Sequence, residues 1–401
     1  MEHFITAINI IQVRHLKNIK IKLKADKRQH LLLTGKNGAG KTSVLCGIAD
    51  TLKAWRSFQP GTVQRVAAYA KALDKDYAQK LEESFQLEPK QTGIKLSFAD
   101  KEGMTEKFFQ GRFLMAYYPA ERKTSMQMPE GIEKIETKKV YGIDESAGSL
   151  LVKYMVHLKT QELYAKNAGD TQLASRINEW FRRFEDALRK LLDNKTVELS
   201  YDYKNYNFQI LEKGREAIGF DQLSDGYSAI IDIVSDLMLR MEQNWIFTDN
   251  LCTYDLEGIV LIDELESHLH IELQRKILPF LTSFFPRLQF IVTTHSPYIL
   301  NSVSNALVYD LEKQIEIEDM SGYSSEGIVE GYFDSEEYSD ELREKLRRYE
   351  ILAFRTDLNN EERAERAALR RELKELPQEL AQAAWDAFAD IEERRKKDGQ
   401  N

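Results

Sequence analysis

LLLTGKNGAGKTS, the stretch from Leu31 to Ser43, joins a short apolar run to a glycine-rich turn. Residues 35–42 match the pattern G-x-x-x-x-G-K-[ST] at every fixed position. The apolar run predicts a strand buried on both faces, and the residues that follow, 43–55, predict a helix. A strand, glycine turn and helix in this order predict an α/β fold with a polyphosphate site at the turn.

The loop supplies the groups that this chemistry needs. Small residues let successive backbone N–H groups point inward, and the helix N-terminus adds partial positive charge. We expect Lys41 to reach the β- and γ-phosphates and the Thr42 hydroxyl to bind Mg²⁺. A chance match has little weight, because the strand and helix that the motif requires flank it. The predicted nucleotide-binding residues of the loop are Gly35, Lys36, Asn37, Gly38, Ala39, Gly40, Lys41, Thr42 and Ser43.

Two further continuous apolar runs, residues 259–262 and 289–293, predict buried strands. A helical pattern over residues 270–285 separates them, so we expect a parallel sheet covered by helices. The first run ends in Asp263 and Glu264, at the sheet edge where α/β proteins bind ligands. Asp263 is predicted to hold Mg²⁺, and Glu264 to orient and polarise the attacking water. Acid pairs also end strands for reasons of turn geometry, so this assignment depends on the phosphate loop.

His295 follows the run at 289–293. A single histidine is more often structural, but at this strand end it can sense a γ-phosphate. The segment from Leu223 to Tyr227, LSDGY, precedes an apolar helix predicted at 227–241. Ser224 can cap that helix and Gly226 permits a close backbone approach. Alone, this segment predicts only a capped helix.

In this order, the phosphate loop, LSDG segment, acid pair and His295 resemble the motifs of ABC-type ATPases. The LSDG segment resembles their signature motif. The resemblance implies that Ser224 and Gly226 contact a γ-phosphate held by Lys41 of a partner chain. The site would then need a homodimer or higher homo-oligomer. It also implies hydrolysis of ATP to ADP and phosphate, with Glu264, Lys41 and His295 catalytic and ATP and Mg²⁺ as cofactors.

Three segments resemble the SMC/RecF/OLD-like branch of that family. DELESHLH, residues 263–270, resembles its form of the acid-pair segment, and residues 14–18 resemble the N-terminal strand of SMC and RecF proteins. Within residues 14–18, Lys17 is expected to lie near the adenine. YYPAER, residues 117–122, resembles a segment of stand-alone ATPases of bacterial anti-phage systems, the Septu and retron-associated types.

The sequence departs from the family in three respects. No Q-loop glutamine stands at a strand end, since Gln110 and Gln127 only flank the expected place. A modest helical insertion replaces the long SMC coiled coil. No Toprim-like acid cluster follows His295, and the acidic run over residues 310–319 predicts a solvated strand edge.

Four parts are predicted along the chain. Residues 1–148 form the N-terminal part of the ATPase, with a polar helical segment at 56–92, and residues 149–194 form the helical insertion. Residues 195–335 carry the signature, acid pair and His295. Residues 336–401 form a charged helical region, expected to be a hairpin packed on the core.

Composition narrows the function. The formal charge of −9 argues against a protein that coats nucleic acid over its whole surface, although a local basic groove is possible. Cys46 and Cys252 fit neither a metal site nor a disulfide scaffold. No signal-peptide pattern or membrane-spanning apolar run is present, which predicts a cytoplasmic protein without a membrane partner.

The leading hypothesis is a regulatory ATPase in anti-phage defence. ATP would close a dimer that positions or releases a separate effector, a nuclease or toxin, with residues 336–398 as a surface for that partner. The alternative is a RecF-like DNA-repair or DNA-loading ATPase, for which a basic cluster between Lys17 and Arg28 would bind nucleic acid. Such clusters are more often solvated strand faces, and the alternation of those lysines with Ile and Leu fits such a face. A transporter subunit is disfavoured by the insertion and the charged C-terminal region.

Overall fold

The computed structural model describes most of the chain, in two units, Met1–Gly322 and Tyr323–Asn401. The described residues are 2–56, 92–100, 103–104, 107–108, 110–122, 126–247, 256–325, 327–328, 340–355, 357–374 and 382–398. Nearly all of the polar segment predicted at 56–92, and Cys252, lie outside the described residues.

The first unit is built on a mixed sheet in the order β12-β11-β3-β10-β9-β5. Five of its strands are parallel, and β12 pairs antiparallel with β11. The strands are β3 (His30–Thr34), β5 (Phe113–Tyr118), β9 (Glu257–Ile262), β10 (Leu288–Thr293), β11 (Ala306–Asp310) and β12 (Ile315–Glu318). Every residue of β3, β9 and β10 is buried, which confirms the three buried strands predicted from their apolar runs.

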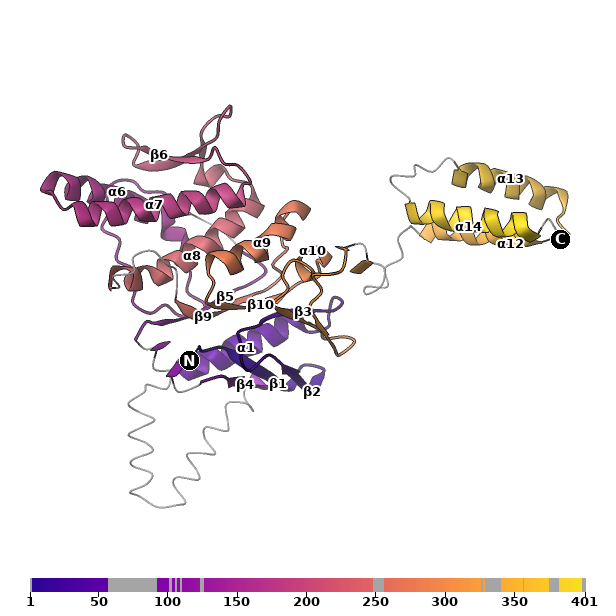
Figure 1. Ribbon diagram of the computed structural model, residues 1–401, viewed down its shortest axis with the longest axis horizontal. Helices are drawn as coiled ribbons and strands as arrows, with labels where there is room; N and C mark the ends of the chain where they lie inside the picture. The colour runs from indigo at the N-terminus through magenta and orange to yellow at the C-terminus, as the bar shows by residue number, and fades with distance from the viewer. Residues whose placement is uncertain are drawn as a thin grey trace, which may run out of the picture. The chain divides into compact units, whose positions relative to one another are not determined.

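Helices cover both faces of this sheet (Figure 1). On one face α1 (Lys41–Arg56) packs between the sheet and a second, antiparallel sheet of order β2-β1-β4. The strands of this second sheet are β1 (Ile5–Val13), β2 (Leu16–Lys22) and β4 (Ile94–Phe98). Side chains of β3, α1 and β1 share one apolar core, which includes Leu31, Val44 and Ile8. On the opposite face lie α8 (Asp225–Phe247), α9 (Ile271–Phe284) and α10 (Pro297–Leu300).

The insertion consists of α6 (Leu151–Ala168) and α7 (Thr171–Leu191), which pack against each other beside α8 (Figure 1). The break predicted at residues 169 and 170 is confirmed. Gly169 ends α6 with a left-handed φ of 76°, and the Asp170 carboxylate caps α7 by accepting from Leu173 N at 3.0 Å. A small antiparallel sheet follows, comprising β6 (Glu198–Asp202), β7 (Asn207–Leu211) and β8 (Ile218–Gly219), and two 3₁₀ turns, η1 (Gly148–Leu150) and η2 (Phe220–Gln222), flank the region.

The second unit contains α12 (Asp340–Phe354), α13 (Asn360–Lys374) and α14 (Gln382–Asp398). The prediction of a helical hairpin was wrong, because the described residues of this unit form three helices and not two. A capping box starts α13: the Asn359 side chain accepts from Glu362 N at 2.8 Å, and Glu362 accepts from Asn359 N at 3.0 Å. These helices enclose an apolar core of their own, with Tyr349 and Leu373 at its centre. Among the described residues, no helix is both long and apolar enough to cross a bilayer.

Candidate nucleotide-binding and hydrolysis site

The glycine-rich loop connects β3 to α1 and depends on residues without side chains. Gly35 has a φ of 130°, and a Cβ there would lie 3.1 Å from Ala39 Cβ and 3.2 Å from Asp310 Oδ1. Gly40 has a φ of 97°, and its Cβ would lie 2.9 Å from Leu16 Cδ1. A side chain at Gly38, by contrast, would meet no atom within 4 Å. The loop is therefore packed on its protein side and open at its tip, as a phosphate cradle requires.

Lys41 is the first residue of α1 and is only 6% exposed. Its Nζ donates to the carbonyl oxygens of Gly35 at 2.8 Å and Lys36 at 3.2 Å, so the charge lies inside the curve of the loop. Burial lowers the pKa of Lys41, and nearby carboxylates, Glu264 first among them, oppose that shift. The arrangement fits the binding of a polyphosphate, whose charge would be met by Lys41 and the α1 N-terminus.

Asp263 lies at the end of β9 and is 1% exposed. Its Oδ1 accepts hydrogen bonds from Thr42 Oγ1 at 3.2 Å and from Thr293 Oγ1 at 2.6 Å. Hydroxyl and carboxylate oxygens are the ligands that Mg²⁺ prefers. The described part of the chain has no group of three or more His, Cys, Asp or Glu that could enclose a metal. The residues therefore fit a Mg²⁺ ion that takes most of its remaining ligands from phosphates and water.

Glu264 directly follows Asp263 and has a left-handed φ of 44°. Its backbone N donates to Thr293 Oγ1 at 2.7 Å, and its Oε2 accepts from Ser267 Oγ at 3.2 Å. A non-glycine residue in this conformation is strained, and such strain is concentrated at functional sites. Both bonds hold Glu264 in one place beside the loop.

His295 lies in the turn after β10. Its backbone N donates to the Glu266 carboxylate, and its Nε2 is buried without a hydrogen-bond partner among the described residues. Burial, followed by the charge of Lys41, lowers the pKa of His295. The imidazole is therefore neutral at pH 7, with an unpaired nitrogen near Lys41.

The predicted signature residues lie elsewhere on the unit. Ser224 precedes the first residue of α8 and is exposed, whereas Gly226 is buried. A Cβ at Gly226 would lie 2.7 Å from the carbonyl oxygen of His268, so glycine is needed for this contact. Both residues line a cavity of about 450 Å³ with Tyr227, His268 and Lys276, and no phosphate-loop residue belongs to it. One chain thus brings together the loop, the acid pair and His295, but not the signature.

Arg122 was missed by the sequence analysis as a site residue. The expected Q-loop position is the end of β5, and Arg122 lies four residues beyond Tyr118, the last residue of that strand. Its Nη2 donates to the carbonyl oxygens of Asp263 at 3.2 Å and Glu264 at 2.6 Å. Its place directly after a strand of the parallel sheet, in the YYPAER segment, was the available signal.

Asp310 corrects the prediction of a solvated acidic edge. It is 3% exposed and its Oδ1 accepts from the backbone N of Glu312 at 2.7 Å and of Lys313 at 2.9 Å. This turn places the Asp310 carboxylate against Gly35. Its charge is one of those that oppose the lowering of the Lys41 pKa by burial. Glu312, Glu316, Glu318 and Asp319 are exposed, as predicted.

The β1–β2 turn packs against the loop through Leu16 and His15, the neighbours of Gly40. Lys17 is exposed on β2, opposite Gln12. The expectation that Lys17 lies near an adenine stays a prediction.

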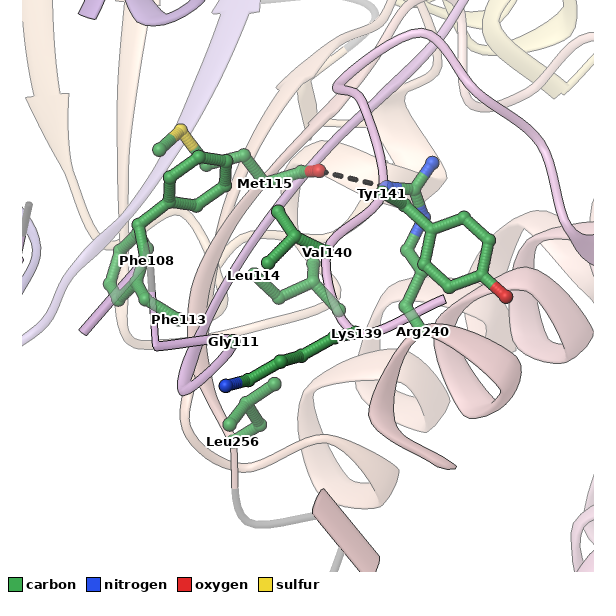
Figure 2. Close-up of a pocket in the computed structure, with 10 residues that line it drawn as sticks. All are labelled: Phe108, Gly111, Phe113, Leu114, Met115, Lys139, Val140, Tyr141, Arg240 and Leu256. Carbon is green, nitrogen blue, oxygen red and sulfur yellow. Dashed lines mark hydrogen bonds between the residues drawn. The ribbon is translucent and has the colours of Figure 1, made fainter. Parts of the chain in front are cut away.

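A separate, small cavity lies at the start of β5, lined among others by Phe108, Tyr141 and Arg240 (Figure 2). There Arg240 Nη1 donates to the carbonyl oxygens of Met115 at 3.1 Å and of Gly142 at 2.9 Å. Its volume of about 20 Å³ is enough for roughly one water molecule, so we interpret it as a packing feature.

The chain is similar in sequence to one family model and to several curated proteins. Residues 156–301 match the family model described as "AAA domain, putative AbiEii toxin, Type IV TA system". The Septu protein PtuA of Bacillus mycoides (strain KBAB4) is 27% identical over 377 residues, 91% of this chain and 49% of the relative. The retron Ec83 probable ATPase of Escherichia coli is 29% identical over 150 residues, 36% of this chain and 27% of the relative.

The chain is thus similar in sequence to Septu and retron ATPases. It spans about half the length of the Septu relative. An SMC head bound to the C-winged helix domain of ScpA matches with a TM-score of 0.40 and 10% identity, covering 80% of this chain and 99% of that one. The parallel sheet, with the phosphate loop between β3 and α1, has the α/β fold of ABC ATPase type that the sequence predicted.

Proposed function

We propose that this chain binds ATP with Mg²⁺ and hydrolyses it at an interface between two copies. The observation that carries the proposal is the convergence of Lys41, the Thr42–Asp263 pair and Glu264 at the carboxyl edge of the sheet. A bound Mg²⁺ would neutralise charge on the phosphates. Thr42 and Asp263 would hold that ion, and Lys41 would hold the β- and γ-phosphates.

The water that attacks the phosphate needs orientation and a proton acceptor, and Glu264 is placed to supply both. Its side chain is held by Ser267 and its backbone by Thr293. The buried Nε2 of His295, which has no hydrogen-bond partner in the part of the chain that the structure describes, can donate to a γ-phosphate oxygen and so report its presence. The residues of one chain thus account for binding and water activation.

The second copy would supply Ser224 and Gly226. Ser224 is exposed, and the cavity that it lines contains no phosphate-loop residue, which supports a contact with phosphates held by Lys41 of another chain. The backbone N–H groups at the start of α8 would then point at the γ-phosphate.

The change Ser224→Arg tests the shared site. A bulky side chain at this exposed position should disable the site that Ser224 completes and lower hydrolysis there by roughly 100-fold, while one chain still binds ATP. Phosphate release and nucleotide affinity would be measured on the same preparation. Ser304→Arg, at an exposed serine remote from the cavity, is the matched control and should hydrolyse normally.

Mixing provides a sharper test of the same change. Ser224→Arg has an intact phosphate loop and Lys41→Ala has an intact signature, so a mixed dimer contains one complete site. Mixing the two inactive variants should restore part of the activity. If no activity returns, Ser224 acts on its own chain and the shared site is wrong.

We further propose that the nucleotide state controls a separate effector, a nuclease or toxin, in anti-phage defence. The support is the homology to Septu and retron ATPases and the presence of a second folded unit, residues 323–401, apart from the ATPase motifs. This unit has its own core and displays exposed charged helices, as a docking surface for a protein would.

A basic sheet face favours a second function, a RecF-like ATPase that binds nucleic acid. Lys17, Lys20 and Lys22 on β2 are exposed, and so is Lys95 on β4. Lys20 and Lys95 both pair with Asn9 of β1, which places these two lysines roughly 10 Å apart across an uncharged strand. Lysines spaced in this way can contact phosphates of a nucleic-acid backbone.

Replacing Lys20 and Lys95 together with Ala tests this second function. If the face binds DNA, affinity should fall and the slope of log K against log salt should shrink by about 2, one unit for each lost phosphate contact. Fluorescence anisotropy with duplex DNA over a salt series would measure both. Lys190→Ala with Lys213→Ala, two exposed lysines elsewhere, is the control. No DNA binding by the unaltered protein, or equal effects of the two pairs, would rule out this face.

A further inference from the structure

We propose that Arg122 and Glu266 act together as positioning residues of the hydrolysis site, fixing the acid pair and the His295 turn against one another. This inference rests on the proposed ATPase function. These two residues would lie where the family has its Q-loop glutamine, which this sequence does not show at a strand end.

Arg122 approaches the acid pair from the neighbouring strand. β5 pairs in parallel with β9, Tyr118 opposite Ile262, so residues that follow β5 lie beside the turn that carries Asp263 and Glu264. One nitrogen of Arg122, Nη2, bridges the carbonyl oxygens of both residues at 3.2 and 2.6 Å. A fixed guanidinium plane suits such a two-point contact, and hydrogen bonds from a charged donor are strong. Arg122 thereby holds the strained turn at which Glu264 has a φ of 44°.

Glu266 holds the other side of the site. Its Oε1 accepts a hydrogen bond from the backbone N of His295, which comes from the turn after β10. The backbone of Leu265 next to it donates to Thr293 O at 3.2 Å, so two bonds join the turns that follow β9 and β10. The position of His295 is therefore set by a side chain of the acid-pair segment.

The two residues also act on each other electrostatically. Burial lowers the pKa of Arg122, and nearby acids oppose that shift. The Glu266 carboxylate has the largest opposing effect of these acids. Burial and the charge of Asp236 raise the pKa of Asp232, on α8, to about 6, and the charge of Arg122 opposes this rise. Arg122 thus faces the acid pair on one side and the helix that begins at the signature on the other.

A separate observation points to a ligand between them. Arg122 Nε, Glu266 Oε2 and His295 Nε2 are buried and have no hydrogen-bond partner among the described residues. Buried polar atoms without partners are uncommon, and here three occur in one site. A donor, a carboxylate acceptor and an imidazole nitrogen that can take either role suit an ordered water, which can donate and accept at once.

The test separates kcat from KM. Arg122→Lys keeps the charge but loses the planar fork, and Glu266→Ala loses the acceptor for His295 N. Each should lower kcat for ATP hydrolysis roughly 10- to 100-fold with KM changed less than about threefold, because misplacement of catalytic groups acts on the chemical step. Glu266→Gln keeps an oxygen acceptor and should recover most of the lost kcat.

The double variant, Arg122→Lys with Glu266→Ala, should lose little more than the worse single variant if the pair works as one unit. Losses that multiply, or a raised KM with unchanged kcat, would overturn the proposal. Arg287→Lys is the matched control: this arginine pairs with Glu257 at the opposite end of β9 and should keep its kcat. An equal loss of kcat in the control would also overturn the proposal, since the effect would then be general. Absence of hydrolysis by the unaltered protein would instead refute the proposed function.

Discussion

Glu264→Gln should bind ATP as the unaltered protein does and hydrolyse it roughly 100-fold more slowly or worse. The amide has the same size as the carboxylate and can still accept a hydrogen bond from Ser267, and the bond from Glu264 N to Thr293 is made by the backbone. The turn should therefore fold unchanged. What is lost is the proton acceptor for the attacking water. Phosphate release at saturating ATP and equilibrium ATP binding would be compared.

The same variant should accumulate as an ATP-bound dimer. ATP bridges two copies in the proposed mechanism, and without hydrolysis nothing opens them. Light scattering after gel filtration in ATP and in ADP would measure the mass. Glu198→Gln, at an exposed glutamate of β6, serves as control and should turn over normally. If Glu264→Gln hydrolyses at the unaltered rate, the assignment of Glu264 is wrong.

A trapped dimer also identifies the partner. Glu264→Gln purified from its native host in ATP should bring down the effector that the ATP state controls. A co-purifying nuclease or toxin would support the regulatory function. Nucleic acid alone, released in high salt and without ATP, would favour the RecF-like function and the lysine face of β2 and β4.

The parts of the fold that could be predicted from the sequence are those fixed by local pattern. β3, β9 and β10 are buried on both faces, so their apolar runs are continuous and cannot be mistaken for half-exposed strands. The loop motif fixes its own geometry, because Gly35 and Gly40 need positive φ. Residues at the ends of neighbouring parallel strands must lie close together, which placed Asp263 and His295 near the loop.

The parts that could not be predicted depend on contacts between distant backbone groups. Arg122 acts on carbonyl oxygens more than 140 residues away, and a carbonyl leaves no trace in a sequence. Glu266 accepts a hydrogen bond from the backbone N–H of His295. Every residue except proline carries this group, so the contact leaves no pattern in the sequence. In the sequence Asp310 is one of several acids in a run that resembles a solvated segment. Its burial depends on the turn after β11, which the sequence pattern does not show. The start of α13 does have a local sequence signal, because Asn359 and Glu362 form a capping box. The many charged residues around this pair made the signal hard to recognise.

Lys41→Ala should weaken ATP binding by roughly 30- to 150-fold, which corresponds to the loss of about 2 to 3 kcal/mol for a charged hydrogen bond to phosphate. The Lys41 ammonium is buried, and its hydrogen bonds to the carbonyls of Gly35 and Lys36 place it where the phosphates would bind. Its removal also takes away a positive charge that opposes the carboxylates of Asp263 and Glu264, so the site would attract an anion less. Titration calorimetry with a slowly hydrolysed ATP analogue would give the affinity.

The loss must be separated from a loss of folding. Within the described part of the chain the hydrogen bonds of Lys41 go to loop carbonyls, so its replacement should disturb the loop and leave the sheet intact, and the melting temperature should change by a few degrees at most. Lys53→Ala removes a lysine from the same helix, one that pairs with Asp50 and Asp144 on the surface, and should bind ATP normally. Unchanged affinity in Lys41→Ala would mean that the nucleotide lies elsewhere. Because the roles proposed for Asp263 and Glu264 both depend on a phosphate held by Lys41, that outcome would remove the basis of the proposed hydrolysis as well.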